Sequence, residues 1–261
     1  MKSIDLNCDM GESFGKYHLG VDEEIIRHIT SANIACGWHA GDPLVMDRTV
    51  KLAVENGVGV GAHPSYPDLL GFGRRNMDCT PQEIRQYVTY QVGALQAFCR
   101  AHSTRLKHVK PHGALYHRAV TDKAAARAVA QAVMDVDPSL CYVALAGEKG
   151  ATMARVGREM GLKVVYEAFP DRAYTQEGTL LPRQNPGAVI KESGKVTERA
   201  LEMVLEGRVK TVDGSSTALK VDTLCVHGDT PGAVELANAI NVAMRAEGVS
   251  LLAMGTDETP E

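Results

Sequence analysis

The stretch HVKPHGALYH, residues 108–117, decides the fold, because in it a short β-like run ends abruptly in proline, histidine and glycine. Three other apolar runs end in a similar way: ANIACGWHAGDP (32–43), VGVGAHPSYPD (58–68) and TLCVHGDTP (223–231). Since a histidine follows a buried run four times, we expect the ends of these strands to form the floor of one polar site.

Seven β-like runs alternate with helical stretches along the 261 residues. Such alternation predicts a parallel sheet, either open and doubly wound or closed into a barrel. No linker, low-complexity run or repeat of fixed period divides the chain, so we expect one domain over residues 1–261. The expected strands are Ser3–Asn7, Ala32–Cys36, Val58–Ala62, His108–Lys110, Cys141–Leu145, Lys163–Glu167 and Thr223–His227.

Three helices have well-marked starts, at Asp42-Pro43, Thr80-Pro81 and Thr230-Pro231. In each case a side-chain oxygen can cap free amide groups, and proline takes the first helical position. These helices are expected over residues 44–56, 82–102 and 232–248, and two more over 121–136 and 196–207, which are rich in alanine, leucine and glutamate.

The alternation of side chains within the runs separates a closed barrel from an open sheet. In the first run residues 4, 6 and 8 are apolar, whereas Asp5, Asn7 and Asp9 are polar and share the other face. An open sheet with helices on both faces would show near-continuous apolar runs instead. We therefore predict an α/β fold, a single-domain (β/α) barrel of seven strands, with its chemistry at the carboxyl ends of the strands.

The nine histidines divide by position. Those at strand ends are the site candidates, whereas those in helices or on the surface are not, and two others are weaker candidates. The strand-end group is His39, His63, His112 and His227; the excluded group is His18, His28 and His102; His108 lies lower on its strand and His117 is expected to begin the next connection.

The bulk composition excludes several classes of protein. A net charge of −4 without a basic cluster argues against nucleic acid as a partner, and no apolar run reaches the ~20 residues of a membrane span. The first residues lack the apolar stretch of a signal peptide. None of the six cysteines forms a C-x-x-C pair, so we expect reduced, mostly buried thiols in a cytoplasmic protein.

Two long connections, residues 64–79 and 169–188, have the length of lids or binding loops. Their arginines, among them Arg74, Arg172 and Arg183, can bind a carboxylate or phosphate as forked donors. No P-loop, dinucleotide-binding fingerprint or nucleophile elbow is found. Asp9, His39 and His63 can hold a divalent metal ion, since imidazole and carboxylate suit zinc or manganese.

Five blocks in order resemble the signature of the LamB/YcsF family: DLNCDMGESFG, SANIACGWHAGDP, GAHPSYPDLLGFGRR, HVKPHGALYH and CVHGDTP. The resemblance runs from Asp5 to about Arg245. It implies a barrel-like (β/α) fold similar to the glycoside hydrolase/deacetylase superfamily. It also implies ATP-dependent opening of 5-oxoproline to L-glutamate, as one component of a 5-oxoprolinase that works with partner subunits B and C.

This chemistry divides the polar residues into roles. Because the chain lacks a P-loop, we expect the partner subunits to phosphorylate the lactam with ATP and this chain to add water and open the ring. The acid and base candidates are Asp9, His39, His63 and His112. Lys110 and Arg74 are expected to hold anionic charge. The substrate-binding candidates as a whole are Asn7, Glu12, Asp42, Arg74, Lys110, Glu167, Asp171, Arg172, His227 and Asp229.

Two other functions remain open at this point. One is a metal-dependent hydrolase that removes acyl groups from amides or sugars and acts alone. The other is a non-catalytic subunit that binds a small acid for its partners. Glutamate release from 5-oxoproline, with and without ATP and partner subunits, separates all three.

Overall fold

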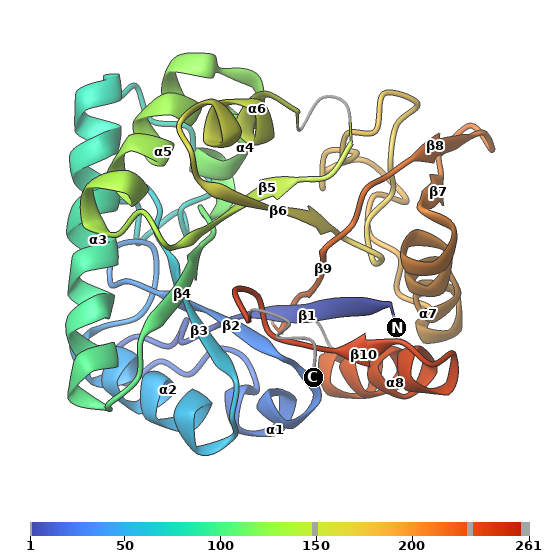
Figure 1. Cartoon of the computed structure of the whole chain (residues 1–261), viewed down its shortest axis with the longest axis horizontal. Coiled ribbons are helices and arrows are strands. Elements are labelled where there is room, and N and C mark those ends of the chain that lie inside the picture. Colours follow the sequence, from blue (N-terminus) through green and yellow to red (C-terminus); the bar gives the residue numbers. More distant parts are fainter. Residues whose placement is uncertain (1, 148–150, 229–231, 257–261) are drawn as a thin grey trace.

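Seven parallel strands form a closed ring in the computed structural model, which describes residues 2–147, 151–228 and 232–256 (Figure 1). The ring follows the chain from β1 to β6 and then passes to β9, which pairs with both β6 and β1. The predicted seven-stranded (β/α) barrel is therefore confirmed. Its strands are β1 (Ser3–Met10), β2 (Ser31–Ala35), β3 (Gly59–His63), β4 (Leu106–Val109), β5 (Cys141–Leu145), β6 (Lys163–Ala168) and β9 (Thr223–Val226).

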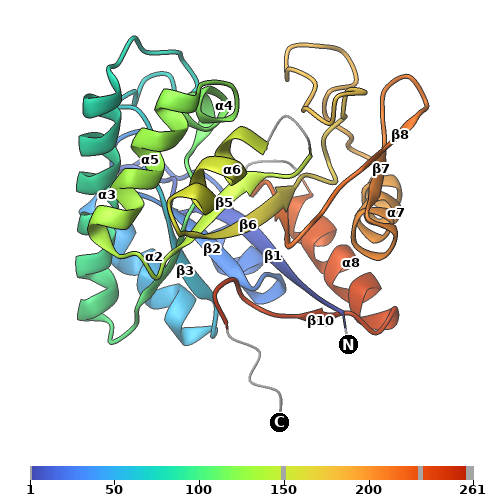
Figure 2. The same cartoon turned by 45° about the horizontal axis from the view of Figure 1, so that its top comes forward.

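Helices surround the ring on its outside, with α3 beside α5 on one flank and α7 beside α8 on the other (Figures 1 and 2). The helical segments are α1 (Asp22–Ile25), a 3₁₀ turn (Ile26–His28), α2 (Pro43–Glu55), α3 (Pro81–Ala101), α4 (Gly113–Thr121), α5 (Lys123–Val136), α6 (Ala151–Glu159), α7 (Ser193–Leu201), a π-helical turn (Glu202–Glu206) and α8 (Ala233–Ala246).

Three further strands lie outside the ring. β7 (Arg208–Lys210) and β8 (Ser216–Ala218) form a small antiparallel hairpin, and β10 (Ser250–Leu251) pairs with the start of β1. None of them was predicted, because two or three residues are too few for a recognisable alternation.

The observed strands lie within a few residues of the expected ones, and the largest difference is in β1. It continues through Asp9 to Met10, because residues 7–10 pair with β2 while residues 5–8 pair with β9. β4 ends at Val109, just before Lys110 and Pro111, although the Lys110 amide still donates to the Ala62 carbonyl. Because β1 extends to Met10, Asp9 belongs to β1 and not to the turn after it.

Helix α4 departs most from the prediction. It begins directly after His112, so His117 lies in a helix and not at the start of a connection. Leu115 and Ala119, one turn apart, are buried, as are Tyr116 and Val120. Nine residues gave too short a periodicity to be recognised beside the turn signals of proline and glycine.

The predicted helix starts agree with the structure where it describes them. Asp42 caps α2, and Thr80 with Glu83 forms a full capping box on α3. The third start, Thr230-Pro231, lies outside the described residues, and α8 begins at Ala233.

The interior of the barrel is polar, as the alternation predicted. Residues 4, 6, 8 and 10 of β1 join the apolar layer between strands and helices, whereas Asp5 and Asn7 point inward. The glycines of β3 leave room for larger neighbours: a Cβ on Gly61 would lie 1.9 Å from His108 Nε2. Because glycine has no Cβ, residue 61 leaves the space that the His108 imidazole occupies inside the ring.

Among the described residues, all six cysteines are free and buried, as expected for thiols that pack as small apolar groups. No helix in the described ranges has the length and apolar character that crossing a membrane requires.

We expect Gly61→Ala to destabilise the protein by about 1–3 kcal/mol, because the new methyl group would collide with the buried His108 ring. Gly93→Ala is the matched control, since its Cβ would meet nothing within 4 Å on helix α3. It should leave stability equal or raise it by about 0.5–1 kcal/mol. Urea unfolding of both variants measures the difference; equal stability would contradict the account of Gly61.

Candidate active site

The lowest layer of the barrel interior is a closed hydrogen-bond network. The Asp5 carboxylate accepts from Ser31 Oγ at 2.6 Å and from Thr30 Oγ1 at 2.7 Å, and also from the Thr223 hydroxyl. Asn7 Nδ2 donates to Thr223 Oγ1 at 2.6 Å. Burial outweighs these bonds and raises the pKa of Asp5 to about 6. The layer fills the ring and supports the groups above it.

Asn33 joins this layer to the next. Its Nδ2 donates to Asn7 Oδ1 at 2.7 Å and to Asp9 Oδ1 at 2.8 Å, and its Oδ1 lies 2.7 Å from His108 Nε2. Since the Asn33 oxygen only accepts, His108 Nε2 carries a proton. Burial, with a smaller contribution from Lys110, lowers the pKa of His108 to about 3, so this imidazole is neutral and structural.

Lys110 is the charge at the centre of the site. Its ammonium lies 2.9 Å from Asp9 Oδ1 and 2.8 Å from Glu167 Oε1, and it contacts Asn7 Oδ1 at 3.3 Å and Cys225 Sγ at 3.1 Å. Burial by itself would lower the pKa of Lys110, but the two carboxylates and the thiol outweigh it and raise that pKa. The cation expected to hold a substrate anion is therefore already neutralised within the protein.

Glu167 is held from two sides. Besides Lys110 on Oε1, Tyr116 from helix α4 donates its hydroxyl to Oε2 at 3.0 Å. Burial and the neighbouring Glu167 charge raise the pKa of Tyr116, so the phenol keeps its proton. Glu167 acts as an internal counter-ion, and Tyr116, a residue not predicted for the site, orients it.

Three strand-end side chains form one wall of the site. His63 Nε2 lies 2.9 Å from His112 Nδ1 and 3.2 Å from Asp9 Oδ2. The outer nitrogens of both rings face carbonyls: His63 Nδ1 is 2.7 Å from Lys110 O, and His112 Nε2 is 2.9 Å from Phe72 O. Burial raises the pKa of Asp9, but its contact with His63 and the charge of Lys110 outweigh burial, and the pKa of Asp9 is well below its usual range.

His39 and Glu12 lie behind this wall. The His39 ring stacks on His112 with centroids 4.0 Å apart, and its Nε2 is 4.0 Å from Glu12 Oε1. In the described part of the chain neither nitrogen of His39 has a hydrogen-bond partner, although the residue is fully buried. Burial, with His112 and His63, lowers the pKa of His39 well below its usual range.

His227 and Asp171 form a second histidine–carboxylate pair at the carboxyl ends of the strands. His227 Nδ1 lies 2.7 Å from Asp171 Oδ2, and the Phe169 ring stacks on the imidazole at 5.7 Å. Burial would raise the pKa of Asp171, but the charge and hydrogen bond of His227 lower it. Asp171 therefore stays ionised and sets His227 with its Nδ1 proton toward the carboxylate.

A hollow of about 510 Å³ opens at the carboxyl ends of the strands, and the histidine of each pair lines it. Asp9, His63 and His112 line it together with His227 and Phe169. The remaining lining includes Arg74, Lys110, Tyr116, His117, Arg172, Leu180, Leu181, Pro182, Arg183 and Gln184. The connection between β6 and α7 supplies residues 180–184 and rises over the barrel in Figure 2.

Three guanidinium groups, those of Arg74, Arg172 and Arg183, give the hollow a positive lobe. The Arg172 side chain is buried and held by the carbonyls of Leu181, at 2.7 Å, and Ala188, at 3.2 Å. Burial and then repulsion from Arg183 lower the pKa of Arg172. Positive groups that repel one another beside a cavity form a site for an anion.

The structure brings most of the predicted site residues together. Asp9, His63, Arg74, Lys110, His112, Arg172 and His227 line the hollow, and Glu12, His39, Glu167 and Asp171 support them from behind. Asn7 lies one layer lower and contacts Lys110. Asp229 lies outside the described residues.

Asp42 does not belong to this group. Its Oδ1 accepts from the amides of Leu44 and Val45 at 2.8 and 3.0 Å, and its Oδ2 accepts from the Gly15 amide at 2.8 Å. Both oxygens are thus used to cap α2 and to hold the loop before it. Asp42 does not line the hollow, and its role as a substrate ligand stays a prediction.

His117, one of the two weaker candidates from the sequence, lines the hollow from helix α4 next to Tyr116. The signal that would have found both was the spacing of Leu115, Ala119 and Val120, which marks the helix and places residues 113–117 at its beginning. Phe169 and Phe72 gave no comparable signal, because an apolar ring in a loop shows its role only through contacts.

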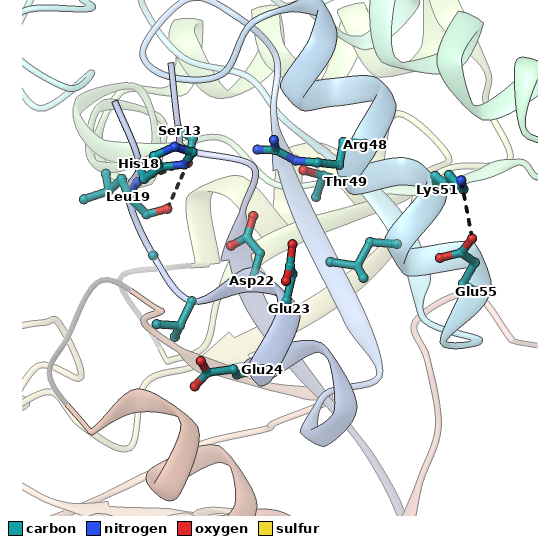
Figure 3. A pocket seen from close by; sticks show the side chains of 13 residues that line it. Ser13, His18, Leu19, Asp22, Glu23, Glu24, Arg48, Thr49, Lys51 and Glu55 are labelled. Atoms are coloured by element: carbon teal, nitrogen blue, oxygen red, sulfur yellow. Dashed lines mark hydrogen bonds and ion pairs between the residues drawn. The ribbon is translucent and has the colours of Figure 1, made fainter. Parts of the chain in front are cut away.

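A different hollow, of about 460 Å³, lies between the loop of residues 13–21, α1 and α2 (Figure 3). Ser13 Oγ and the Leu19 carbonyl are 3.3 Å apart at one edge, and Lys51 and Glu55 form an ion pair of 3.8 Å at the other. Glu23, Arg48 and Lys51 are exposed there, and none of the barrel-interior groups lines it. Solvated charges of this kind do not make an active site.

The fold and the site together define a class: a (β/α)-barrel protein with a polar, histidine-rich hollow at the carboxyl ends of its strands. The chain belongs to the LamB/YcsF family, whose model matches residues 4–258. The resemblance noted from the sequence blocks is thereby confirmed.

Curated relatives match nearly the whole chain. A protein of Pyrococcus abyssi (strain GE5 / Orsay), named as the A subunit of 5-oxoprolinase, is 55% identical over 249 residues, which are 95% of this chain and 96% of that protein. A relative of the same name from Syntrophobacter fumaroxidans (strain DSM 10017 / MPOB) is 54% identical over 96% of this chain and 98% of its own length.

Solved structures agree with the fold. The Lactam Utilization Protein from Thermus thermophilus is 48% identical and superposes with a TM-score of 0.92, over 97% of this chain and 100% of that one. A putative cellobiose-phosphate cleavage protein from Enterococcus faecalis V583 is 12% identical with a TM-score of 0.56 over 97% of both chains, which shows a common fold alone.

We expect Lys110→Met to destabilise the protein by about 3–5 kcal/mol, because it leaves the buried Asp9 and Glu167 carboxylates without their cation. Lys51→Met, which removes only an exposed ion pair with Glu55, should cost less than about 1 kcal/mol. Urea unfolding at pH 7 compares the two. If both variants lost the same small amount, Lys110 would not be the central counter-ion.

The pKa of about 3 for His108 predicts a loss of stability in mild acid. The unfolded chain takes up the proton near pH 6.5 and the folded chain does not, so the stability present above pH 6.5 falls as the pH falls toward 3. Between pH 7 and pH 5 this group alone accounts for about 2 kcal/mol. The glutamine of His108→Gln can still donate to Asn33 but does not titrate. Between pH 7 and pH 5 the free energy of unfolding of this variant should therefore fall by about 2 kcal/mol less than that of the unchanged protein. Equal losses in urea unfolding at the two pH values would refute the assignment.

Proposed function

We propose that this chain is the ring-opening component of an ATP-dependent 5-oxoprolinase and converts the lactam 5-oxoproline to L-glutamate together with partner subunits B and C. Relatives that share about half of its residues over nearly all of their length are named as the A subunit of 5-oxoprolinase. The structure with a TM-score of 0.92 is that of a protein called a lactam utilization protein.

The observation that carries the proposal is the pair of histidine–carboxylate groups around one hollow. Opening a lactam requires a group that activates water, and an acid that protonates the departing nitrogen. Asp9 with His63 and His112 forms one such group, and Asp171 with His227 forms the other. A hollow of about 510 Å³ has ample room for a five-membered ring between them.

The two groups differ in their surroundings, which supports different roles. The wall of Asp9, His63 and His112 presents acceptor atoms to the hollow and suits water activation. The His227 imidazole has its Nδ1 proton on Asp171, an ionised carboxylate that stabilises an imidazolium. In the ring-opening step the water oxygen bonds to the phosphorylated ring carbon and gives up its proton to the wall of Asp9, His63 and His112, and the carbon–nitrogen bond breaks as His227 Nε2 delivers a proton to the nitrogen. The acyl phosphate formed in this way is then hydrolysed by a second water to L-glutamate and inorganic phosphate.

The positive lobe supports an anionic substrate. A single carboxylate, the only one that 5-oxoproline has, is satisfied by one or two forked guanidinium groups. Arg74, Arg172 and Arg183 together exceed that need, and Lys110 is already neutralised. The excess of positive charge favours a lactam that arrives with a phosphoryl group on its oxygen, which also makes the ring carbon electrophilic.

This assignment leaves ATP to the partners. The sequence has no P-loop, and phosphorylation by subunits B and C would precede the step described above. A hydrolase that acts alone on acyl groups would need no such partner, and a subunit that only binds the acid would not need the paired histidines.

The proposal predicts that glutamate is released from 5-oxoproline only when this chain, subunits B and C, and ATP are all present. His227→Asn in the full complex should lower kcat by about 10²–10⁴-fold with little change in KM, since it removes a proton donor and not a binding group. His102→Asn on the surface, where the ring contacts Asp47, is the matched control and should leave both constants unchanged.

Three outcomes would contradict the proposal. Glutamate release by the isolated chain without ATP would favour the lone hydrolase. Full turnover by the His227→Asn complex would remove the acid from its role. Tight binding of 5-oxoproline with turnover insensitive to both His63 and His227 would favour the non-catalytic subunit.

A further inference from the structure

The nitrogens with which His63 and His112 face each other lack a proton between them. A carbonyl oxygen only accepts, so the contacts to Lys110 O and Phe72 O place the single proton of each neutral ring on its outer nitrogen. His63 Nε2 and His112 Nδ1 are then both lone pairs, yet they are 2.9 Å apart. Asp9 Oδ2, 3.2 Å from the same His63 nitrogen, is a third acceptor.

His63 Nε2 thus lies against two other acceptors, and such atoms repel one another unless a positive species lies among them. Two species satisfy the geometry: a proton shared by the two rings, or a metal cation coordinated by all three atoms. The proton would leave His39 unexplained, because that buried ring has no hydrogen-bond partner among the described residues.

We propose that Asp9 Oδ2, His63 Nε2 and His112 Nδ1 bind a divalent transition-metal cation, and that His39 and Glu12 contact its water ligands. The ligand atoms offered by Glu12, His39, His63 and His112 all lie within 4.8 Å of one another. Glu12 and Asp9 add negative charge to the set. This differs from the set expected from the sequence, in which His39 was a ligand and His112 was not.

The spacing of the three acceptors indicates the kind of cation. Ligand bonds of about 2.1 Å place neighbouring atoms about 3.0 Å apart around an octahedral ion and about 3.4 Å apart around a tetrahedral one. The separation of 2.9 Å between the two imidazole nitrogens is close to the octahedral value, and the separation of 3.2 Å between His63 and Asp9 lies midway between the two values. Two imidazoles and one carboxylate with open positions suit Mn²⁺, Fe²⁺, Co²⁺ or Ni²⁺ better than the all-oxygen ligand preference of Mg²⁺.

His39 fits an outer layer and not direct coordination. Its ring is stacked on His112 at 4.0 Å with an angle of 10° between the planes, so the in-plane lone pairs of the two rings run side by side and do not converge. The gap of 4.0 Å between His39 Nε2 and Glu12 Oε1 is wider than a hydrogen bond and suits a bridging water. Such outer contacts orient the ligands of a metal and tune its affinity.

The carbonyls of Lys110 and Phe72 contact the outer nitrogens of His63 and His112 and hold the two rings in place. A histidine that binds a metal through one nitrogen usually donates its other N–H to a carbonyl or carboxylate. His63 does so to Lys110 O and His112 to Phe72 O. When bound, a divalent cation lowers the pKa of a coordinated water; its use in lactam opening rests on the proposed function, whereas its binding does not.

Binding is measured on the whole chain after dialysis against a chelator. Isothermal titration with Co²⁺ and Mn²⁺ should give one site per chain, and the Co²⁺ complex should show the weak visible absorption of an octahedral ion. His63→Gln, His112→Gln and Asp9→Asn should each weaken Co²⁺ binding about 100-fold or more, and His39→Gln about 10-fold. His117→Gln, which changes a lining residue outside the set, and His102→Gln on the surface should bind as the unchanged chain does.

Circular dichroism of each variant distinguishes loss of the fold from loss of metal binding. The glutamine and asparagine replacements keep a polar side chain of similar size. Binding that persists in His63→Gln and His112→Gln would overturn the proposal. So would the absence of binding by the unchanged chain, accompanied by nitrogen NMR signals of a proton shared between His63 and His112 up to pH 8. Neither result depends on lactam turnover, so a failure here is distinct from a failure of the proposed function.

Discussion

The buried ammonium of Lys110 is the interaction on which the rest of the site depends. It lies inside a ring of strands where water cannot screen it, and it balances the Asp9 and Glu167 carboxylates within 2.9 Å. Charges removed from water are tolerated only when they are paired and hydrogen-bonded. Asn7, Asn33 and Tyr116 complete that pairing, so the polar interior is a single structure from the floor of the barrel to the mouth.

The same residue also sets the chemistry of the wall beside it. The carbonyl of Lys110 fixes the proton of His63 on Nδ1, which turns Nε2 toward Asp9 and His112. The carbonyl of Lys110 thereby sets the lone-pair direction of His63, and its ammonium, together with His63, keeps the Asp9 carboxylate ionised. On the other side of the hollow, Asp171 alone fixes the Nδ1 proton of His227 and thereby the direction of its Nε2 lone pair. A site of two histidine–carboxylate groups follows from these few contacts, and the arginines of the long connections add the charge that an anionic substrate needs.

Much of this was predictable from the strand ends. Polar residues on one face of each run, with histidine at the end, predicted both the closed ring and the group Asp9, His63, His112 and His227. The differences between the expected and the observed arrangement have physical reasons. Asp42 has the side chain of a ligand, but an aspartate before proline at a helix start is bound by the helix amides first. Lys110, expected to hold substrate charge, lines the hollow, and two acidic residues from other strands also pair with it. Helix α4 was missed because its nine residues follow a turn signal without interruption.

The sequence by itself determined which residues face the barrel interior, because alternation along a strand is a local property of the chain. It also determined the family, through blocks whose order and spacing are specific. Only the tertiary structure decided which interior groups touch: β9 closes the ring against both β1 and β6, and that register sets Lys110 between Asp9 and Glu167 and leaves His63 facing His112. Distances between residues far apart in the chain depend on strand register and closure, and no local pattern carries that information.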